Sequence, residues 1–295
     1  MNNALVIGSG VMGSGIAQLL SINKIKTIIT DSSIDNLKKS KEKVLLNLDS
    51  LLKKSIITKN QKAESIKNID FMKILDQEIN QVDFVIEAAN ENFDTKKKIF
   101  KMLEKKISAN CVLATNTSSI SISKIASELK FPERFIGMHF FNPATIMKLV
   151  EIVKGRETNM ETTDKIIKLT KRLGKIGVIS KDSPGFISNR ILMPMINEAI
   201  ETLRGNVAEA DEIDSVMRLG MAHPMGPLKL ADLIGLDVCM SILEVLRDGF
   251  NDKKYDPSPL LVKMVNEGKL GRKLGKVFIN TIKLNDCFIK FYHEY

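Results

Sequence analysis

Short apolar runs alternate with amphipathic stretches through the first half of the chain. The runs have the length and the branched side chains of buried parallel strands, and the stretches between them carry apolar residues at helical spacing. We expect strands at residues 4–7, 26–31, 82–88, 111–115 and 134–139. We expect helices at residues 35–54 and 95–106. This alternation predicts an α/β region with a doubly wound parallel sheet, which binds ligands at the carboxyl ends of its strands.

The pattern changes at Pro184 and Gly185, after which strand-like runs largely stop. We expect helices at residues 186–203, 208–219, 227–234 and 236–247, since these segments begin near Pro, Asp or Glu and end near Gly. Pro194 should kink the first of them. The sequence therefore predicts an α/β domain over residues 1–183 and an all-α domain over residues 184–295.

The composition is that of a globular protein with a substantial core. The chain has 295 residues, of which 44% are hydrophobic. No apolar stretch reaches the roughly 18 residues of a membrane span, and no basic leader precedes the first apolar run, so we expect neither a membrane anchor nor a signal peptide. The three cysteines are far apart and odd in number, which predicts a reducing cytoplasm, no disulfide framework and no metal site.

The net charge of +9 has two interpretations. Basic proteins bind nucleic acids, anionic membranes or phosphorylated small molecules. The lysines are nevertheless spread along a chain rich in Ile and Asn, which favours a general compositional bias. Because aromatic residues make up only 5%, and no nucleic-acid motif is present, we expect no nucleic-acid partner.

A glycine-rich loop follows the first predicted strand. Gly8, Gly10 and Gly13 have the G-x-G-x-x-G spacing, with Val11 and Met12 between the last two. In dinucleotide sites the first glycine permits a tight turn, the second lets a pyrophosphate approach the backbone, and the third lets the helix pack closely. A strand before the loop and a helix after it complete the pattern, which predicts a Rossmann-type NAD site.

Asp31 ends the second predicted strand, 18 residues after Gly13. A carboxylate at this point accepts hydrogen bonds from the adenosine ribose and repels a 2′-phosphate, so it selects NAD over NADP. The alternative is that Asp31 only caps the next helix. The three glycines and the acid together favour NAD binding.

His139 lies at the end of an apolar run, in the segment GMHFFNP at residues 137–143. It is either a core histidine with a satisfied hydrogen bond or a residue that moves a proton. Glu151 shares a strand face with Leu149 and Val153, and burying its carboxylate is costly unless it is paired. A pair with His139 would orient the imidazole and make it a better base; a solvent-exposed Glu151 on an edge strand is the alternative.

Other polar residues also follow predicted strands. Glu91, the turn NTSS at residues 116–119 and His139 should gather on the cofactor's side of the sheet. In the helical half, Asn189 lies among apolar residues near a helix start, where an Asn is either exposed or holds something polar.

Several motifs, read in order, resemble the 3-hydroxyacyl-CoA dehydrogenase family, and within it the bacterial 3-hydroxybutyryl-CoA dehydrogenases. They are VIGSGVMGSGIA, VIEAANEN, NTSSISI, GMHFFNP, MKLVEIV, DSPGFISNRIL, PMINEAI and HPMGPLKLADLIGLDV. The resemblance extends from the first strand to GRKLGK at residues 271–276. Beyond it the chain departs from the family's usual ending, since Val277 replaces a glycine and Ile279 an aromatic residue.

The resemblance implies a role for each matching residue. His139 takes the position of the catalytic base, Glu151 that of the carboxylate orienting it, Ser118 that of a contact to the nicotinamide region and the substrate oxygen, and Asn189 that of a substrate contact. The family's other NAD contacts fall on Glu91, Lys96, Asn142 and Lys273, and a coenzyme A contact falls on Lys54.

The activity that the resemblance implies is the reversible, NAD-dependent oxidation of an (S)-3-hydroxyacyl-CoA to a 3-ketoacyl-CoA by a homodimer. The apolar faces of residues 191–203, 207–219 and 228–246 also exceed what one short helical domain can cover. Two alternatives stay open. One is a dehydrogenase of free 3-hydroxy acids, which would typically rely on a lysine base, and the other is a non-catalytic NAD-binding relative.

Overall fold

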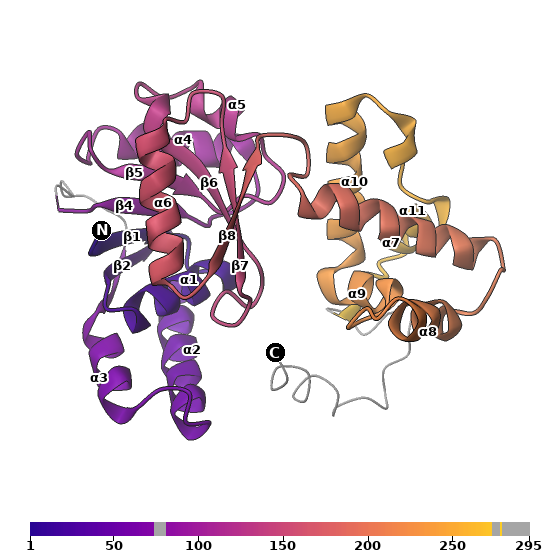
Figure 1. Ribbon diagram of the computed structural model, residues 1–295, viewed down its shortest axis with the longest axis horizontal. Helices are drawn as coiled ribbons and strands as arrows, with labels where there is room; N and C mark the ends of the chain where they lie inside the picture. The colour runs from indigo at the N-terminus through magenta and orange to yellow at the C-terminus, as the bar shows by residue number, and fades with distance from the viewer. Residues whose placement is uncertain (74–80, 273–277, 279–295) are drawn as a thin grey trace. The chain divides into compact units, whose positions relative to one another are not determined.

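The computed structural model describes residues 1–73, 81–272 and 278. They form two compact units, Met1–Phe186 and a second that begins at Ile187, and each unit is described by itself (Figure 1). None of the helices in the described segments has the length and apolar character needed to cross a membrane.

The first unit is built on one eight-stranded sheet with the strand order β3-β2-β1-β4-β5-β6-β7-β8. Its strands are β1 Asn3–Ile7, β2 Lys26–Asp31, β3 Ile69–Lys73, β4 Phe84–Glu87, β5 Val112–Thr115, β6 Phe135–Phe140, β7 Leu149–Lys154 and β8 Ile176–Lys181. The five predicted strands are all present, and the predicted Rossmann-type architecture is confirmed.

One strand reverses the direction of the sheet. Neighbours among β1 to β6 are parallel, whereas β7 runs antiparallel to β6, and β8 is parallel to β7. The predicted parallel sheet therefore contains one antiparallel pair, between β6 and β7. The connection between β6 and β7, residues 141–148, is shorter than the dozen or so residues that a parallel crossover needs.

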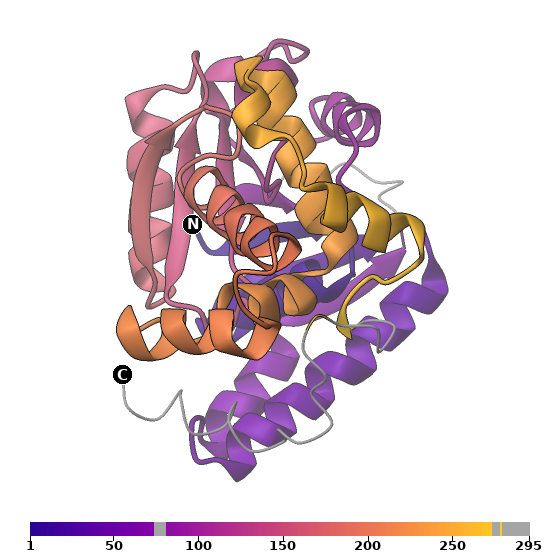
Figure 2. The same cartoon turned by 90° about the vertical axis from the view of Figure 1, so that its right-hand side faces the viewer.

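Helices cover both faces of this sheet. They are α1 Val11–Ile22, α2 Ile34–Lys53, α3 Lys59–Lys67, α4 Phe93–Leu103, α5 Ile122–Ala126 and α6 Met160–Arg172, with a 3₁₀ turn η1 at Pro132–Arg134. Strand side chains alternate between the faces: Ala4 and Val6 join the core under α1, α2 and α6, whereas Leu5 and Ile7 join the core under α4 and α5. Helices α2 and α3 lie side by side at one end of the unit (Figures 1 and 2).

The second unit is helical, as predicted, over its described residues 187–272. It contains α7 Ser188–Arg204, α8 Ala210–Gly220, α9 Pro227–Ile234, α10 Leu236–Phe250 and α11 Pro259–Asn266, with a 3₁₀ turn η2 at Lys253–Tyr255. The helices pack around one apolar core that includes Ile196, Leu228 and Leu243. Helix α7 runs through Pro194 as one uninterrupted helix.

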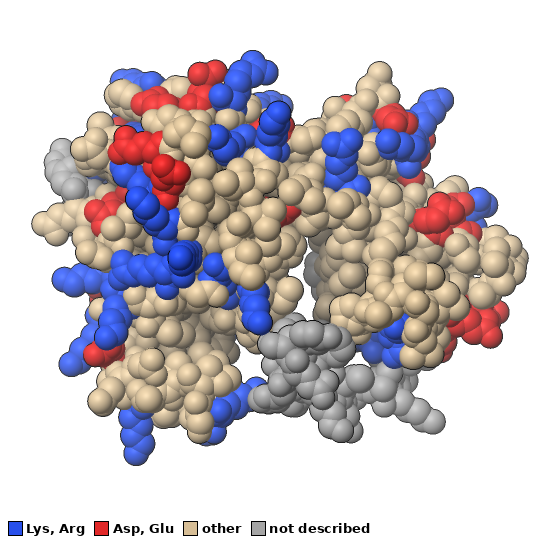
Figure 3. All heavy atoms as spheres, in the orientation of Figure 1, with Lys and Arg blue, Asp and Glu red and all other residues tan. Residues whose placement is uncertain are grey.

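The positive charge is dispersed on the face shown in Figure 3. Lys and Arg side chains are spread widely there, with Asp and Glu side chains among them. This distribution favours compositional bias as the origin of most of the net charge of +9.

Candidate active site

The loop between β1 and α1 is shaped by its glycines. Gly8 has a φ of +96°, and an added Cβ there would lie 2.6 Å from the carbonyl oxygen of Ala88. At Gly13 an added Cβ would lie 1.8 Å from the carbonyl oxygen of Gly8, so the helix can approach the strand only without a side chain. At Gly10 the same position is open space. The loop thus keeps a gap into which a pyrophosphate fits.

The N-terminus of α1 is suited to an anion. Helices α2, α4 and α6 begin with side-chain caps from Ser33, Asn92 and Asn159. Within the described residues, α1 has no such cap, and its first turn starts at Val11 and Met12 after Gly10. The first-turn amides and the helix dipole are therefore available to a phosphate group.

Asp31 lies beside this loop. Its Oδ2 accepts hydrogen bonds from the amide and the hydroxyl of Ser9, both at 2.8 Å, and its Oδ1 accepts one from the amide of Ser33 at 2.9 Å. Burial alone would raise the pKa of Asp31, but these hydrogen bonds lower it below the usual 3.8. The carboxyl group is therefore ionised at neutral pH. Ser33, not Asp31, caps α2, which removes the alternative interpretation of Asp31.

Ser9 was missed in the sequence. It is 5% exposed and stands between the first two glycines of the loop. The feature of the sequence that could have identified Ser9 is a hydroxyl side chain at that position, because Asp31 ends the neighbouring strand β2 within reach of it.

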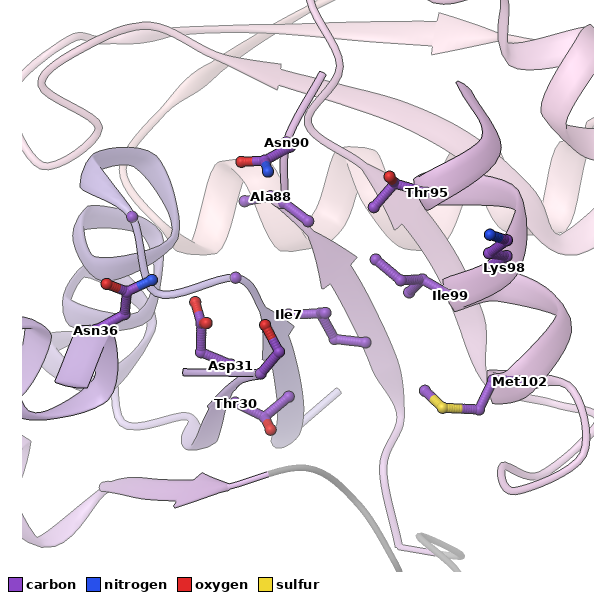
Figure 4. Close-up of a pocket in the computed structure, with 14 residues that line it drawn as sticks. Ile7, Thr30, Asp31, Asn36, Ala88, Asn90, Thr95, Lys98, Ile99 and Met102 are labelled. Atoms are coloured by element: carbon purple, nitrogen blue, oxygen red, sulfur yellow. The ribbon is translucent and has the colours of Figure 1, made fainter. Parts of the chain in front are cut away.

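A cavity of about 500 Å³ opens between the loop and α4. Asp31 and Asn36 lie on one side of it, and Thr95, Ile99 and Met102 of α4 lie on the other (Figure 4). A polar edge opposite an apolar wall is suited to a ribose and an aromatic base. The glycine loop, the uncapped helix and this cavity together fit a dinucleotide.

A buried ion pair lies at the end of β4. Glu87 and Lys96 are 0% and 1% exposed, and Lys96 Nζ lies 2.7 and 2.9 Å from the two Glu87 oxygens. Thr115 Oγ1 and the amide of Ala89 donate to the same carboxyl group at 2.6 and 2.7 Å. Burial raises the pKa of Glu87, but all four contacts come from donors. The donor contacts oppose this shift, because each of them favours the ionised form.

The burial of Lys96 was not predicted. Lys96, Phe100 and Leu103 are the buried residues of α4 and share one face of it. This i, i+4, i+7 spacing was the signal that could have identified Lys96 among three consecutive lysines.

Glu91 accepts several hydrogen bonds from the turn that follows β5. Its Oε1 accepts hydrogen bonds from Thr117 Oγ1 at 2.5 Å, Ser118 N at 2.8 Å and Ser119 N at 3.1 Å, while its Oε2 lies 3.3 Å from Lys96 Nζ. Burial would raise the pKa of Glu91, but the Lys96 ammonium and these hydrogen bonds lower it. Glu91 therefore carries a negative charge beside Ser118.

The same turn is attached to the end of β6. Asn116 Oδ1 accepts a hydrogen bond from the amide of Phe140 at 2.9 Å. The structure thus brings Glu91, residues 116–119 and the strand that carries His139 to one end of the sheet.

His139 and Glu151 form a buried pair across β6 and β7. They are directly opposite in the antiparallel register, and His139 Nδ1 lies 2.7 Å from Glu151 Oε2. Their exposed fractions are 8% and 1%. Since a carboxylate only accepts, Nδ1–H donates and Nε2 keeps its lone pair. The alternative of an exposed Glu151 on an edge strand is wrong, because β8 lies beyond β7.

Two aromatic rings flank the imidazole of His139. The centroid of Phe141 lies 4.7 Å from it and that of Phe186 6.1 Å from it. These rings restrict the orientation of the imidazole and keep water from its sides.

The remaining predicted site residues lie on separate elements of the chain. Asn142 is exposed in the turn after β6, and its peptide bond to Pro143 is cis. Lys54 is exposed at the C-terminal end of α2. Asn189 is 7% exposed in α7 and belongs to the second unit. Lys273 lies outside the described residues.

Family models match both units. Residues 3–183 match the NAD binding domain of 3-hydroxyacyl-CoA dehydrogenase, and residues 185–281 match the C-terminal domain of 3-hydroxyacyl-CoA dehydrogenase. The chain belongs to the 3-hydroxyacyl-CoA dehydrogenase family. The resemblance seen in the motifs is thereby confirmed.

Individual members of the family are similar over nearly the whole chain. The 3-hydroxybutyryl-CoA dehydrogenase of Bradyrhizobium diazoefficiens is 44% identical, over 92% of this chain and 93% of the relative. A probable 3-hydroxybutyryl-CoA dehydrogenase of Deinococcus radiodurans is 45% identical, over 92% and 98%. The crystal structure of (S)-3-hydroxybutyryl-CoA dehydrogenase from Ralstonia eutropha has a TM-score of 0.91 at 43% identity, covering 94% of this chain and 98% of that chain.

Proposed function

We propose that this protein is an NAD-dependent dehydrogenase that interconverts (S)-3-hydroxyacyl-CoA and 3-ketoacyl-CoA, with 3-hydroxybutyryl-CoA and acetoacetyl-CoA as its pair. The observation that carries the proposal is the buried His139–Glu151 pair in the sheet that also bears the dinucleotide loop. The names of its relatives support the choice of substrate.

NAD would be bound along the carboxyl ends of the strands. The loop and Asp31 hold the pyrophosphate and the adenosine ribose, and the turn that carries Ser118 faces the nicotinamide half. The residues assigned to NAD are Gly8, Gly10, Val11, Met12, Gly13, Asp31, Glu91, Lys96, Ser118, Asn142 and Lys273. Because Lys96 is buried against Glu87, it acts on the cofactor through Glu91. When bound, NAD supplies the hydride acceptor.

His139 moves the proton of the reaction. Nε2 accepts it from the substrate hydroxyl, and Glu151 holds Nδ1–H and stabilises the imidazolium that forms. In the opposite direction the imidazolium returns the proton. Ser118 and Asn189 hydrogen-bond the substrate oxygens and hold the reacting carbon in place, and such positioning lowers the barrier by several kcal/mol.

Lys54 is assigned to a phosphate of coenzyme A. Its exposed ammonium at the end of α2 can reach a ligand on the surface. Attraction between exposed charges is worth about 1 kcal/mol and is screened by salt. The contact therefore tunes substrate affinity and takes no part in the reaction.

We also propose a division of labour: residues 1–183 form the NAD-binding domain, to which Lys273 adds one contact, and residues 184–295 contribute Asn189 to the substrate site and the surface that binds a second copy. In the second unit Ile191, Val207, Val216 and Leu219 are 67%, 75%, 61% and 80% exposed. A homodimer formed through this surface would cover them. A cytoplasmic location agrees with Cys111 and Cys239, which are buried free thiols.

Oxidation of NADH with acetoacetyl-CoA, compared with free acetoacetate, tests the function. The proposal predicts rapid oxidation with the thioester and at least about a hundredfold lower kcat/KM with the free acid, because the binding energy of coenzyme A is then lost. Equal efficiency would indicate a dehydrogenase of free acids. Tight NADH binding without oxidation of either substrate would indicate a non-catalytic relative.

A further inference from the structure

Glu87 is a charged residue in a fully buried strand. It is 0% exposed and ends β4 after Phe84, Val85 and Ile86, which are buried as well. Burying a carboxylate is costly unless it is paired. Glu87 reacts with nothing in the proposed mechanism, so its burial calls for another role.

Lys96 lies between two carboxylates. Its Nζ is 2.7 and 2.9 Å from the oxygens of Glu87 but 3.3 Å from Glu91. One ammonium therefore serves two acids, and the three groups together carry one surplus negative charge. Of the three side chains, Glu91 is the exposed one, at 38%, against 1% for Lys96 and 0% for Glu87. The surplus charge is accordingly presented to a ligand at Glu91.

The oxidised and reduced cofactors differ in charge at the ring. The nicotinamide of NAD⁺ is a cation, and that of NADH is neutral, whereas the phosphates are the same in both. A fixed negative charge near the ring therefore favours the binding of NAD⁺ over the binding of NADH. Because the site is partly shielded from water, this preference is stronger than it would be on an open surface.

We propose that Glu87 sets the preference of the site for oxidised over reduced cofactor: by drawing Lys96 into a closer, buried pair, it leaves the charge of Glu91 only partly compensated beside the nicotinamide ring. This inference rests on the proposed function, which assigns the Ser118 turn to the nicotinamide half. Without the Glu87 charge, Lys96 would compensate Glu91 alone and more fully. Glu87 is thus a positioning residue that acts through Lys96.

Binding measurements on Glu87→Gln test the proposal. NADH affinity is measured by fluorescence titration and NAD⁺ affinity by competition against NADH, with no substrate present. We expect the ratio Kd(NAD⁺)/Kd(NADH) to rise about three- to tenfold, as expected for removal of one charge acting over several ångströms in partly shielded surroundings. The change should come mainly from weaker NAD⁺ binding.

Two controls separate charge from structure. Glu128→Gln removes the same charge from the surface, where Glu128 pairs with Lys97 and Lys101 of α4 at 3.0 and 2.7 Å, and it should leave the ratio unchanged. Glu87→Asp keeps the charge, so the ratio should stay within about twofold of wild type even if both affinities fall.

Three results would overturn the inference. They are an unchanged ratio in folded Glu87→Gln, an equal shift in Glu87→Asp, and a shift of the same size in Glu128→Gln. Should Glu87→Gln fail to fold, Glu91→Gln removes the surplus charge directly and must raise the ratio; an unchanged ratio there also refutes the inference. If the wild-type protein binds neither cofactor, the proposed function itself fails, and that outcome is distinguishable from the others.

Discussion

Asp31 and Glu151 are two carboxylates held by hydrogen bonds in very different ways. Asp31 is partly exposed, and its contacts from Ser9 and Ser33 come from neutral donors. Glu151 is 1% exposed, and it contacts His139, the residue that we propose transfers the proton. Under the proposed mechanism, Asp31 remains a fixed anion that recognises the cofactor, whereas Glu151 compensates a charge that appears and disappears on His139.

Removing the charge of Glu151 should have the larger effect. In Glu151→Gln we expect kcat to fall about 10²- to 10³-fold, because the amide can donate to Nδ1 and favour the tautomer whose Nε2 already carries a proton. The Kd of NADH should stay within about twofold of wild type, since the proposed mechanism assigns Glu151 to proton transfer. Glu157→Gln, an exposed acid three residues after β7, is the matched control. Equal losses of kcat in Glu151→Gln and Glu157→Gln would show that the loss does not come from the pairing of Glu151 with His139. The distinction between Asp31 and Glu151 would then fail.

Removing the charge of Asp31 should change recognition and leave the chemistry intact. In Asp31→Asn the ratio of kcat/KM for NADH to that for NADPH should fall about 10- to 100-fold, because a 2′-phosphate no longer meets a carboxylate. The kcat at saturating NADH should change little. An unaltered ratio would show that another group selects the cofactor.

The pH dependence of cofactor choice follows from the same hydrogen bonds. The pKa of Asp31 is lowered below 3.8, so the carboxyl group is ionised at all higher pH values and loses its charge only as the pH falls through that lowered value. The NADH preference of the wild-type protein should therefore be constant from about pH 7 to pH 9, where the 2′-phosphate of NADPH is also fully ionised. Initial rates with NADH and NADPH across this range test it, and a preference that changes between pH 7 and pH 9 would contradict it.

The smallest effect is expected from the hydroxyl of Ser9. Ser9→Ala removes one of the two hydrogen bonds that Ser9 donates to Asp31 and keeps the one from the amide. A hydrogen bond to a charged group contributes about 1.5 kcal/mol or somewhat more, and part of this loss is recovered by water. We expect the KM for NADH to rise two- to fivefold, by this estimate, with kcat unchanged. A loss of kcat in place of a change in KM would mean that Ser9 affects more than Asp31.

Features set by local spacing were predictable from the sequence. The glycine loop and Asp31 are recognised within one strand–helix–strand unit, and the partner of Glu151 follows from the cost of an acid in an apolar strand. The antiparallel direction of β7 could have been derived from the short connection after β6, but it was not. β3 was also missed, because this strand at the end of the sheet order is largely exposed and lacks the apolar run of the inner strands.

The buried charges depend on contacts between distant segments. Nothing in the segment DTKKKIF shows that one of its three lysines meets Glu87, because that acid lies on another element and both are buried only when α4 packs on the sheet. Likewise, the contacts of Glu91 with residues 117–119 join the carboxyl ends of β4 and β5. Such pairs become visible only in three dimensions.

The proposed mechanism assigns proton transfer to His139 and recognition of the cofactor to the Asp31 carboxylate. The most direct test is the single-turnover rate of NADH oxidation by His139→Gln with saturating acetoacetyl-CoA, measured together with the Kd of NADH. We expect a rate about 10²- to 10⁴-fold below wild type and a Kd within about twofold of it. A rate close to that of the wild type would contradict the assignment of the base, and a large loss of NADH affinity would contradict the separation of the two roles.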